Sequence, residues 1–214
     1  MPREHFSHVT SWVFDLDNTL YPPDARLFDQ IEARMTAFLV RELGVEEEEA
    51  AALRRTYWRA HGTTLAGLME VHGVDPEPYL EEVHEIDLSA LDRDPALAAA
   101  IRALPGRKIV YTNGSRGHAE RVTEARGLDG VFDAVFGVED AGYAPKPRAD
   151  AFARVFAAAG VAVEAGAMFE DDPRNLAVPH DLGMKTVLVA EDHPGDAHIH
   201  HHTVDLRDFL TRLR

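Results

Sequence analysis

The sequence predicts an α/β protein, a doubly wound, Rossmann-like parallel sheet with a small helical domain inserted after its first strand. Short apolar segments repeatedly run into polar residues, and from about residue 95 onward they alternate with helical patterns. This alternation is typical of a parallel sheet that carries helices on both faces. Residues 21–92, by contrast, show helical spacing and no strand pattern.

Four segments have the form of buried strands. The first, Val9 to Phe14, is apolar and partly β-branched, and it runs directly into Asp15. The later segments of this form are Lys108 to Tyr111, Ala167 to Phe169 and Thr186 to Val189. Ligands of such sheets bind beyond the carboxyl ends of the strands, so we expect Asp15, Thr112 and Asp171 to meet there.

Helical patterns connect the strands and fill the insertion. Those between strands are Gly117 to Arg126, Arg148 to Ala159 and Pro173 to Leu182. In the insertion, apolar residues from Leu27 to Leu39 follow helical spacing, and the patterns over Glu46 to His61 and Thr64 to His72 predict further helices. The sequence therefore predicts a core domain of residues 1–20 and 93–214 and a helical domain of residues 21–92.

Composition restricts the partners of the chain. Its 214 residues carry a net charge of -15, which disfavours binding to a nucleic acid polymer. The absence of cysteine excludes disulfides, thiolate metal sites and a Cys nucleophile, and it fits a reducing cytoplasm. The sequence starts without a signal-peptide pattern, and its apolar runs are far shorter than the roughly 20 residues of a membrane span. We therefore expect a soluble cytoplasmic protein without a membrane partner.

The residues after the first strand, Asp15-Leu16-Asp17-Asn18-Thr19, offer two carboxylates for catalysis. One can act as a nucleophile, and the other, two residues later, can handle protons. Asp and Thr are also common turn formers, so this motif is weak when taken alone. Its weight comes from three other segments.

Two of these segments have the chemistry of a phosphate site. Thr112-Asn113-Gly114-Ser115 offers hydroxyls and backbone N–H groups freed by glycine, although a plain strand-to-helix turn has the same composition. Lys146 lies between two prolines, and the second of them keeps Lys146 out of the helical region, which suits a fixed cation. The alternative for Lys146 is an exposed loop lysine.

The third segment, Glu170-Asp171-Asp172, concentrates acidic residues at the end of a buried strand. Asp172 can cap a helix that begins at Pro173, which leaves Glu170 and Asp171 unexplained. Each like-charged pair at about 4 Å costs roughly 4 kcal/mol at an effective dielectric near 20, and a bound divalent cation reverses that sign. Hard oxygen ligands favour Mg²⁺ over zinc, so the segment predicts a magnesium site.

In kind and in order, these motifs resemble the haloacid dehalogenase (HAD) superfamily of phosphohydrolases. The resemblance rests on Asp15 to Leu20, Thr112 to Gly114, Lys146 and Phe169 to Asp171, which together span nearly the whole chain. It implies the HAD core fold, with the insertion as a helical cap that closes over the substrate in relatives. It also implies a magnesium-dependent phosphomonoesterase in which Asp15 attacks phosphorus and forms an aspartyl-phosphate.

The resemblance further implies the roles of individual residues. Asp17 is expected to protonate the departing oxygen and then to activate water, and Lys146 is expected to supply a second positive centre in catalysis. Mg²⁺ is expected to be held by Asp15, Asp171 and the backbone carbonyl of Asp17, with Glu170 in indirect, water-mediated contact. The phosphoryl oxygens are expected to contact Thr112, Asn113, Gly114 and Lys146.

More narrowly, the segments Trp12 to Pro22 and His61 to Leu68 resemble the pyrimidine 5′-nucleotidase branch. This resemblance implies a small phosphorylated metabolite such as UMP or CMP as substrate. The candidates for contacts to its base or ribose are Tyr21, Tyr57, Thr63, Thr64 and Met69.

Three alternatives to a pyrimidine nucleotidase stay open. The first is a broad-specificity phosphatase for sugar phosphates or phosphoglycolate. The second is a haloacid dehalogenase, against which the Asp17 and Asp171 pair argues. The third is a non-catalytic binding protein, whose expected signature, the loss of one catalytic group, is not found in the sequence.

Two further features have simpler interpretations. The tract His198-Ile199-His200-His201-His202 is dense enough in imidazoles to bind zinc or nickel, but we expect a solvated loop. It leads into an amphipathic terminal helix with apolar residues at Leu206, Phe209, Leu210 and Leu213. Trp12 and Trp58 are expected to be packing residues.

Overall fold

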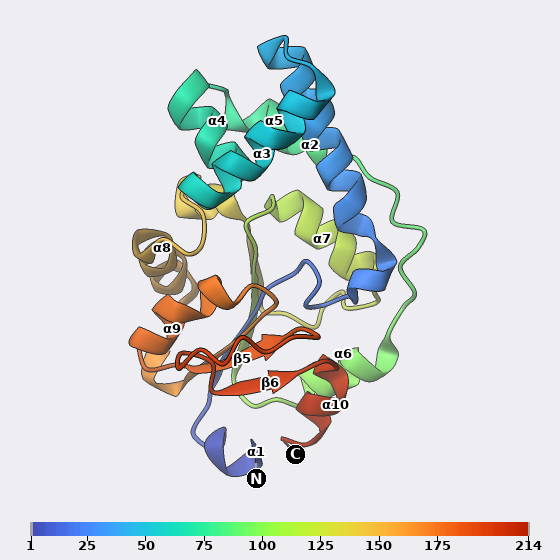
Figure 1. Cartoon of the computed structure of the whole chain (residues 1–214). Coiled ribbons are helices and arrows are strands. Elements are labelled where there is room, and N and C mark those ends of the chain that lie inside the picture. Colours follow the sequence, from blue (N-terminus) through green and yellow to red (C-terminus); the bar gives the residue numbers. More distant parts are fainter. Residues whose placement is uncertain (1, 214) are drawn as a thin grey trace.

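The computed structural model describes residues 2–213 and contains a six-stranded sheet in which every neighbouring pair is parallel (Figure 1). Its strands are β1 (Ser11–Phe14), β2 (Arg107–Tyr111), β3 (Ala134–Phe136), β4 (Gly166–Glu170), β5 (Lys185–Val189) and β6 (His201–Thr203). They lie in the order β3-β2-β1-β4-β5-β6. The predicted parallel α/β sheet is confirmed.

The register of the central strands brings distant residues to one edge of the sheet. Strand β1 lies between β2 and β4, and Phe14 is level with Val110 on one side and with Phe169 on the other. The N–H of Asp15 continues this pairing by donating to the carbonyl of Phe169 at 2.9 Å. The residues that follow β1, β2 and β4 therefore emerge side by side.

Helices cover both faces of the sheet. Trp12 and Phe14 point into one apolar core, and Val13 points into the other. The first core is closed by α6 (Pro95–Arg102), α7 (Arg116–Ala125) and α10 (Leu206–Thr211), and the second by α8 (Ala149–Ala159) with η4 (Pro173–Leu176). Because both faces are buried, the strands read as continuous apolar runs and do not alternate with polar residues.

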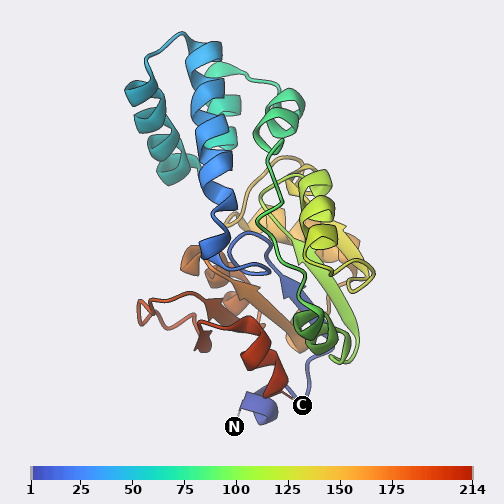
Figure 2. The same cartoon turned by 90° about the vertical axis from the view of Figure 1, so that its right-hand side faces the viewer.

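The insertion forms a helical layer above the carboxyl edge of the sheet (Figures 1 and 2). It contains η1 (Pro23–Ala25), α2 (Leu27–Leu43), α3 (Glu47–His61), α4 (Thr64–His72) and α5 (Pro76–Val83). Its apolar side chains, which include Phe38, Tyr57, Leu68 and Tyr79, form a further apolar core that Val138 of η2 (Val138–Ala141) completes. The division into a core domain of residues 1–20 and 93–214 and a cap domain of residues 21–92 stays a prediction.

Three segments differ from what the sequence predicts. Strands β3 and β6 have three residues each, too few for a recognisable pattern. Because β6 pairs with β5 through His201 and His202, the expectation of a solvated loop over the whole tract 198–202 is wrong. The helix predicted over 173–182 is divided into η4 and α9 (Ala177–Asp181), since Pro179 has no N–H to donate to the carbonyl of Asn175.

The first and last helices, α1 (Pro2–His5) and α10, lie close together on the side of the sheet away from the insertion (Figures 1 and 2). Helix α1 leads into Phe6, whose ring packs edge-on against Phe209 of α10 at a centroid distance of 5.8 Å. Within residues 2–213, no helix is both long and apolar enough to cross a lipid bilayer.

Candidate active site

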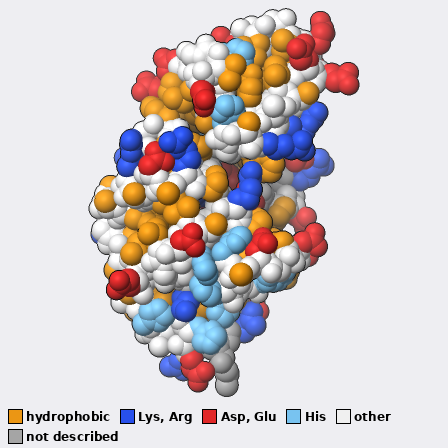
Figure 3. Space-filling view, turned by 60° about the vertical axis from the view of Figure 1, so that its left-hand side comes forward, with side chains coloured by type: hydrophobic (Ala, Val, Ile, Leu, Met, Phe, Trp, Pro, Cys, Tyr) orange, Lys and Arg blue, Asp and Glu red, His pale blue; other side chains and the backbone are white. Residues whose placement is uncertain are grey.

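A cavity of about 430 Å³ lies between the carboxyl edge of the sheet and the helices of the insertion. Its polar floor includes Asp15, Asp17, Thr112, Asn113, Gly114, Lys146, Glu170 and Asp171, so the structure gathers the predicted catalytic, metal and phosphate residues in one place. Figure 3 shows Lys and Arg side chains around the hollow between the upper and lower parts of the molecule. The arginines that line it are Arg54, Arg55, Arg59 and Arg174.

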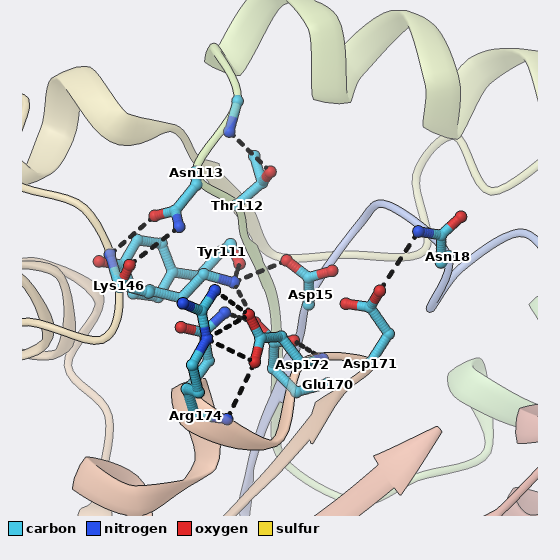
Figure 4. A network of polar contacts seen from close by, with 12 residues as sticks. Asp15, Asn18, Tyr111, Thr112, Asn113, Lys146, Glu170, Asp171, Asp172 and Arg174 are labelled. Carbon is cyan, nitrogen blue, oxygen red and sulfur yellow. Dashed lines mark hydrogen bonds and ion pairs between the residues drawn. The ribbon is translucent and has the colours of Figure 1, made fainter. Parts of the chain in front are cut away.

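Asp15 and Lys146 form a buried ion pair on the floor of the cavity (Figure 4). The Nζ atom of Lys146 lies 2.6 Å from Oδ1 of Asp15, and it also donates to Oε1 of Glu170 at 2.7 Å and to the carbonyl of Tyr111 at 3.0 Å. Burial by itself would lower the pKa of Lys146, but the charges of Asp15 and Glu170 raise it above its ordinary value. Lys146 is therefore a fixed buried cation and not an exposed loop lysine.

Glu170 is 1% exposed, and donors hold both of its oxygens. Oε1 accepts from Lys146 and from Nδ2 of Asn175 at 2.7 Å, and Oε2 accepts from the N–H of Asp172 at 2.8 Å. Asp172 caps η4 as predicted, because its Oδ1 accepts from the N–H of Arg174 at 3.0 Å. Asn175 is a supporting residue that the sequence motifs do not indicate.

Asp15, Glu170 and Asp171 form a site suited to a divalent cation. Each offers a carboxylate oxygen, and these oxygens lie within 4.8 Å of one another. Burial, together with the charge of Glu170, raises the pKa of Asp15 to about 8, and the same two causes raise the pKa of Asp171. A cation relieves this repulsion, and a donor set made only of oxygens fits Mg²⁺.

Asp17 lies beside this cluster and is held by two donors. Its Oδ1 accepts from the hydroxyl of Tyr21 at 2.6 Å and lies 3.3 Å from Nε2 of His118. Burial by itself would raise the pKa of Asp17, but the hydrogen bond and charge of His118, with the hydrogen bond of Tyr21, hold that pKa below its ordinary value. The left-handed Asn18, with a φ of 59°, forms the tight turn that separates Asp17 from Thr19.

The turn after β2 supports both the cavity and Lys146. The hydroxyl of Thr112 accepts from the N–H of Gly114 at 2.9 Å, so its own proton remains available to a ligand. The side chain of Asn113 clamps the backbone of Lys146, since Oδ1 accepts from its N–H at 2.7 Å and Nδ2 donates to its carbonyl at 3.1 Å. Asn113 therefore fixes the position from which Lys146 reaches Asp15.

Most of the chain matches a known protein family. The family model described as haloacid dehalogenase-like hydrolase matches residues 12–183, a segment that contains the elements of the cavity floor. The chain belongs to the haloacid dehalogenase-like (HAD) hydrolase family. This match does not distinguish the pyrimidine 5′-nucleotidase branch from others.

One curated relative of this HAD hydrolase is Phosphate metabolism protein 8 of Saccharomyces cerevisiae. The two are 25% identical over 132 residues, which is 57% of this chain and 41% of the yeast protein. The chain thus matches less than half the length of that relative.

Solved structures share the fold at low sequence identity. CbbY from Rhodobacter sphaeroides in complex with phosphate has a TM-score of 0.64 at 18% identity, over 94% of this chain and 96% of that one. The HAD hydrolase YfnB from Bacillus subtilis bound to magnesium has a TM-score of 0.63 at 17% identity, over 96% and 99%. L-2-haloacid dehalogenase from Xanthobacter autotrophicus has a TM-score of 0.52 at 19% identity, over 87% and 79%. Because the group includes a dehalogenase, the fold alone does not select the reaction.

Of the five substrate candidates in the insertion, two line the cavity of the HAD hydrolase. These are Thr63 and Thr64, at the start of α4. Tyr21 instead donates its hydroxyl to Asp17, and Tyr57 is buried with its hydroxyl 2.7 Å from Nε2 of His72. Met69 packs against the core of the insertion. The structure therefore places these last three side chains outside the cavity lining.

Trp58 was expected to be a packing residue, and this expectation is wrong. Its side chain is 45% exposed and lines the cavity, and the guanidinium carbon of Arg174 lies 3.8 Å from its ring centroid. Trp12, in contrast, is buried and donates to the carbonyl of Pro105 at 2.7 Å. Helical spacing does not reveal that Trp58 faces the segment after β4, because its partner Arg174 is distant in the sequence.

The histidines after residue 197 form no metal cluster comparable to the acidic one. Within residues 2–213, only Asp15, Glu170 and Asp171 place three candidate ligand atoms within 4.8 Å of one another. Backbone groups engage two of the histidines, since Nε2 of His198 lies 2.8 Å from the carbonyl of Pro173 and Nε2 of His202 lies 2.7 Å from that of Ala190.

Proposed function

We propose that this HAD hydrolase is a magnesium-dependent phosphomonoesterase that acts on pyrimidine mononucleotides such as UMP or CMP through an aspartyl-phosphate. The observation that carries the proposal is the placement of Asp15. This carboxylate lies on the cavity floor beside Lys146 and within reach of the acidic groups of Glu170 and Asp171. An anionic nucleophile that approaches an anionic phosphate needs positive charge around it, which Lys146 and a divalent cation held by these carboxylates would supply.

Asp15 acts as the nucleophile. One of its carboxylate oxygens attacks phosphorus, a new P–O bond forms, and the P–O bond to the leaving group breaks with its electron pair on the ester oxygen. Lys146 holds Oδ1 of Asp15 at 2.6 Å and stabilises its ionised form. Mg²⁺ would be held by Asp15, Asp171 and the backbone carbonyl of Asp17, with Glu170 nearby through water, and it would neutralise charge on the phosphoryl oxygens.

Asp17 handles the proton in both half-reactions. It first donates a proton to the departing ester oxygen, and its carboxylate then takes a proton from the water that hydrolyses the aspartyl-phosphate. The ionised form that His118 and Tyr21 favour suits the second step. A dianionic phosphate in the cavity raises the proton affinity of Asp17, which suits the first step.

The phosphoryl oxygens have donors at the end of β2. Thr112 and Asn113 line the cavity, and the N–H of Asn113 has no hydrogen-bond partner among residues 2–213. The N–H of Gly114 is already used by Thr112. We assign phosphate binding mainly to Thr112, Asn113 and Lys146, and we assign Gly114 to the turn that presents them.

The far wall of the cavity supports a leaving group with a polar, planar edge. Arg54 and Glu32 form an ion pair there, and they line the cavity among apolar side chains such as Ile31 and Leu80. Nε of Arg54 and the hydroxyl of Tyr79 are buried without a hydrogen-bond partner among the described residues. Donors beside a carboxylate in an apolar wall fit the carbonyl and N–H groups of a pyrimidine base.

Phosphate release from p-nitrophenyl phosphate, with and without Mg²⁺, tests the reaction. We expect activity that requires Mg²⁺ and that Asp15→Asn lowers on the order of 10⁴-fold or more, as for other covalent nucleophiles. An Asp15→Asn variant that is folded and fully active would contradict the mechanism. Release of chloride from a 2-chloro acid, with no release of phosphate, would favour a dehalogenase.

Rates on UMP, CMP, AMP, glucose 6-phosphate and phosphoglycolate test the substrate class. We expect UMP and CMP to have the highest kcat/KM. Substitution of Arg54 by Met should remove the preference for UMP over glucose 6-phosphate while the activity on p-nitrophenyl phosphate remains. Equal rates on all five esters would favour the broad-specificity alternative.

A further inference from the structure

Asp17 has two unequal oxygens. Oδ1 receives the hydroxyl of Tyr21 at 2.6 Å and the Nε2 atom of His118 at 3.3 Å. Oδ2 has no recorded hydrogen bond among residues 2–213, and the side chain, 18% exposed, lines the cavity. One oxygen is therefore held by two side chains, and the other is available to a ligand.

The two donors come from the buried interior and not from the cavity. Tyr21 is 1% exposed and His118 is fully buried, and neither lines the cavity. Tyr21 lies one turn after Asp17, whereas His118 lies on α7, far away in the sequence. Two independent segments thus converge on the same carboxylate oxygen.

His118 has no other polar role that would explain its burial. Its Nδ1 atom is buried and has no hydrogen-bond partner among the described residues. The Oδ1 atom of an ionised carboxylate can only accept, so the Nε2 atom of His118, 3.3 Å away, carries a hydrogen and donates it to Asp17. An imidazole buried with one nitrogen unpaired is costly, and the contact to Asp17 is its compensating interaction.

Packing fixes the plane of the His118 ring. His84, at the end of α5, stacks on it with ring centroids 4.4 Å apart and planes inclined by 12°. Nδ1 of His84 lies 3.1 Å from the hydroxyl of Ser115, which caps α7. A Cβ atom at Gly114 would lie 3.3 Å from His84 and 3.4 Å from His118, so glycine permits this close packing.

We infer that Tyr21 and His118 are positioning residues, which hold Oδ1 of Asp17 so that Oδ2 faces the oxygen of the leaving group. The inference rests on the proposed function of Asp17. Transfer of a proton in the transition state contributes roughly 10²- to 10⁴-fold to a rate, and only when the donor oxygen is within hydrogen-bond reach. Loss of either tether allows the carboxyl group to rotate, and proton delivery becomes less frequent.

Dependence on the leaving group tests this role. The p-nitrophenolate ion departs readily without a proton, whereas an alkoxide such as that of glycerol phosphate does not. We expect Tyr21→Phe and His118→Leu to lower kcat/KM for glycerol phosphate at least 10-fold and that for p-nitrophenyl phosphate less than 3-fold. The ratio kcat/KM is used because it reports the steps up to departure of the leaving group.

Two comparisons separate positioning from a loss of structure. His118→Gln restores an N–H donor near the position of Nε2, and it should recover part of the glycerol phosphate activity that His118→Leu loses. Tyr57→Phe removes another buried hydroxyl, which is bonded to His72 at 2.7 Å away from the cavity lining, and it should leave the ratio of the two kcat/KM values unchanged. Thermal unfolding confirms that each variant is folded.

The outcomes distinguish this inference from the proposed function. If the unsubstituted enzyme releases phosphate and Asp17→Asn selectively loses the glycerol phosphate activity, equal losses on both esters in Tyr21→Phe and His118→Leu would overturn the positioning role alone. The absence of any loss in these two variants would overturn it as well. If the unsubstituted enzyme hydrolyses neither ester, or if Asp17→Asn shows no such selectivity, the proposed function itself fails and the inference falls with it.

Discussion

The guanidinium group of Arg174 in the core lies over the indole ring of Trp58 in the insertion, with 3.8 Å between the guanidinium carbon and the ring centroid. Both residues line the cavity, and the guanidinium group of Arg174 also donates to Oδ2 of Asp172 at 3.0 and 2.5 Å. The contact therefore joins the insertion to the segment that carries the predicted metal ligand Asp171.

We expect Trp58→Ala to raise KM about 3- to 10-fold with a smaller change in kcat. A cation–π contact contributes on the order of 1 kcal/mol, and its loss weakens the contact between the two walls of the cavity that Trp58 and Arg174 belong to. Trp58→Phe keeps an aromatic face and serves as the control. Steady-state kinetics on the best substrate gives both parameters. In a double-mutant cycle with Arg174→Met, full additivity would show that the contact has no energetic role.

Magnesium should stabilise the folded protein as well as activate it. The carboxylates of Asp15, Glu170 and Asp171 repel one another, and a cation relieves that repulsion. We expect saturating Mg²⁺ to raise Tm by several degrees, since about 1 kcal/mol corresponds to roughly 2–4 °C for a chain of this size. Scanning calorimetry with EDTA or Mg²⁺ measures this shift.

Asp171→Asn separates repulsion from metal binding in the same assay. Without Mg²⁺ the variant should unfold at the same temperature as the unsubstituted protein or higher, because it removes one of the crowded charges. With Mg²⁺ this order should reverse. A shift in Asp171→Asn as large as in the unsubstituted protein would place the ion elsewhere.

The sequence was sufficient to predict that the site residues come together, because their positions follow from the parallel sheet. Asp15, Thr112 and Asp171 each follow an apolar strand, and parallel strands of one sheet end at one edge. Phe14 is level with Val110 and with Phe169, so the residues that follow the three strands lie at the same height of the sheet. This prediction does not depend on how the side chains pack.

The direction of individual side chains could not be predicted in this way. The sequence is equally compatible with a Tyr21 side chain that contacts substrate and with one that supports Asp17. In the structure, a turn in which the N–H of Leu20 donates to the carbonyl of Leu16 at 2.9 Å precedes Tyr21, and the hydroxyl of Tyr21 donates to Asp17. His118 contacts Asp17 from 101 residues further along the chain, and a local sequence pattern does not contain such a contact. Strand β6 depends on pairing with β5, a tertiary interaction that outweighs the polar character of its histidines.

Removal of the Lys146 charge should destabilise the protein strongly. Lys146 is 1% exposed and neutralises Asp15 and Glu170, so Lys146→Met leaves two buried carboxylates without a cationic partner. We expect a loss of about 3 to 5 kcal/mol in the free energy of unfolding, measured by urea titration, together with loss of phosphatase activity. Lys185→Met is the control, because Lys185 is only partly buried and has no recorded ion pair among the described residues, and a change within about 0.5 kcal/mol is expected.

His84 should make stability depend on pH. Burial, together with the charge of the neighbouring His118, lowers the pKa of His84 to about 3, against 6.5 in the unfolded chain. The folded state therefore binds fewer protons, and the stability from neutral His84 is lost progressively as the pH falls below about 6.5. The raised pKa of Asp15 has the opposite effect on stability, and bound Mg²⁺ suppresses it, so the measurement is made with Mg²⁺ present. We then expect the Tm of the unsubstituted protein to fall from pH 7 to pH 5, and the Tm of His84→Gln to fall less. Parallel curves for the two proteins would mean that His84 is already protonated in the folded state.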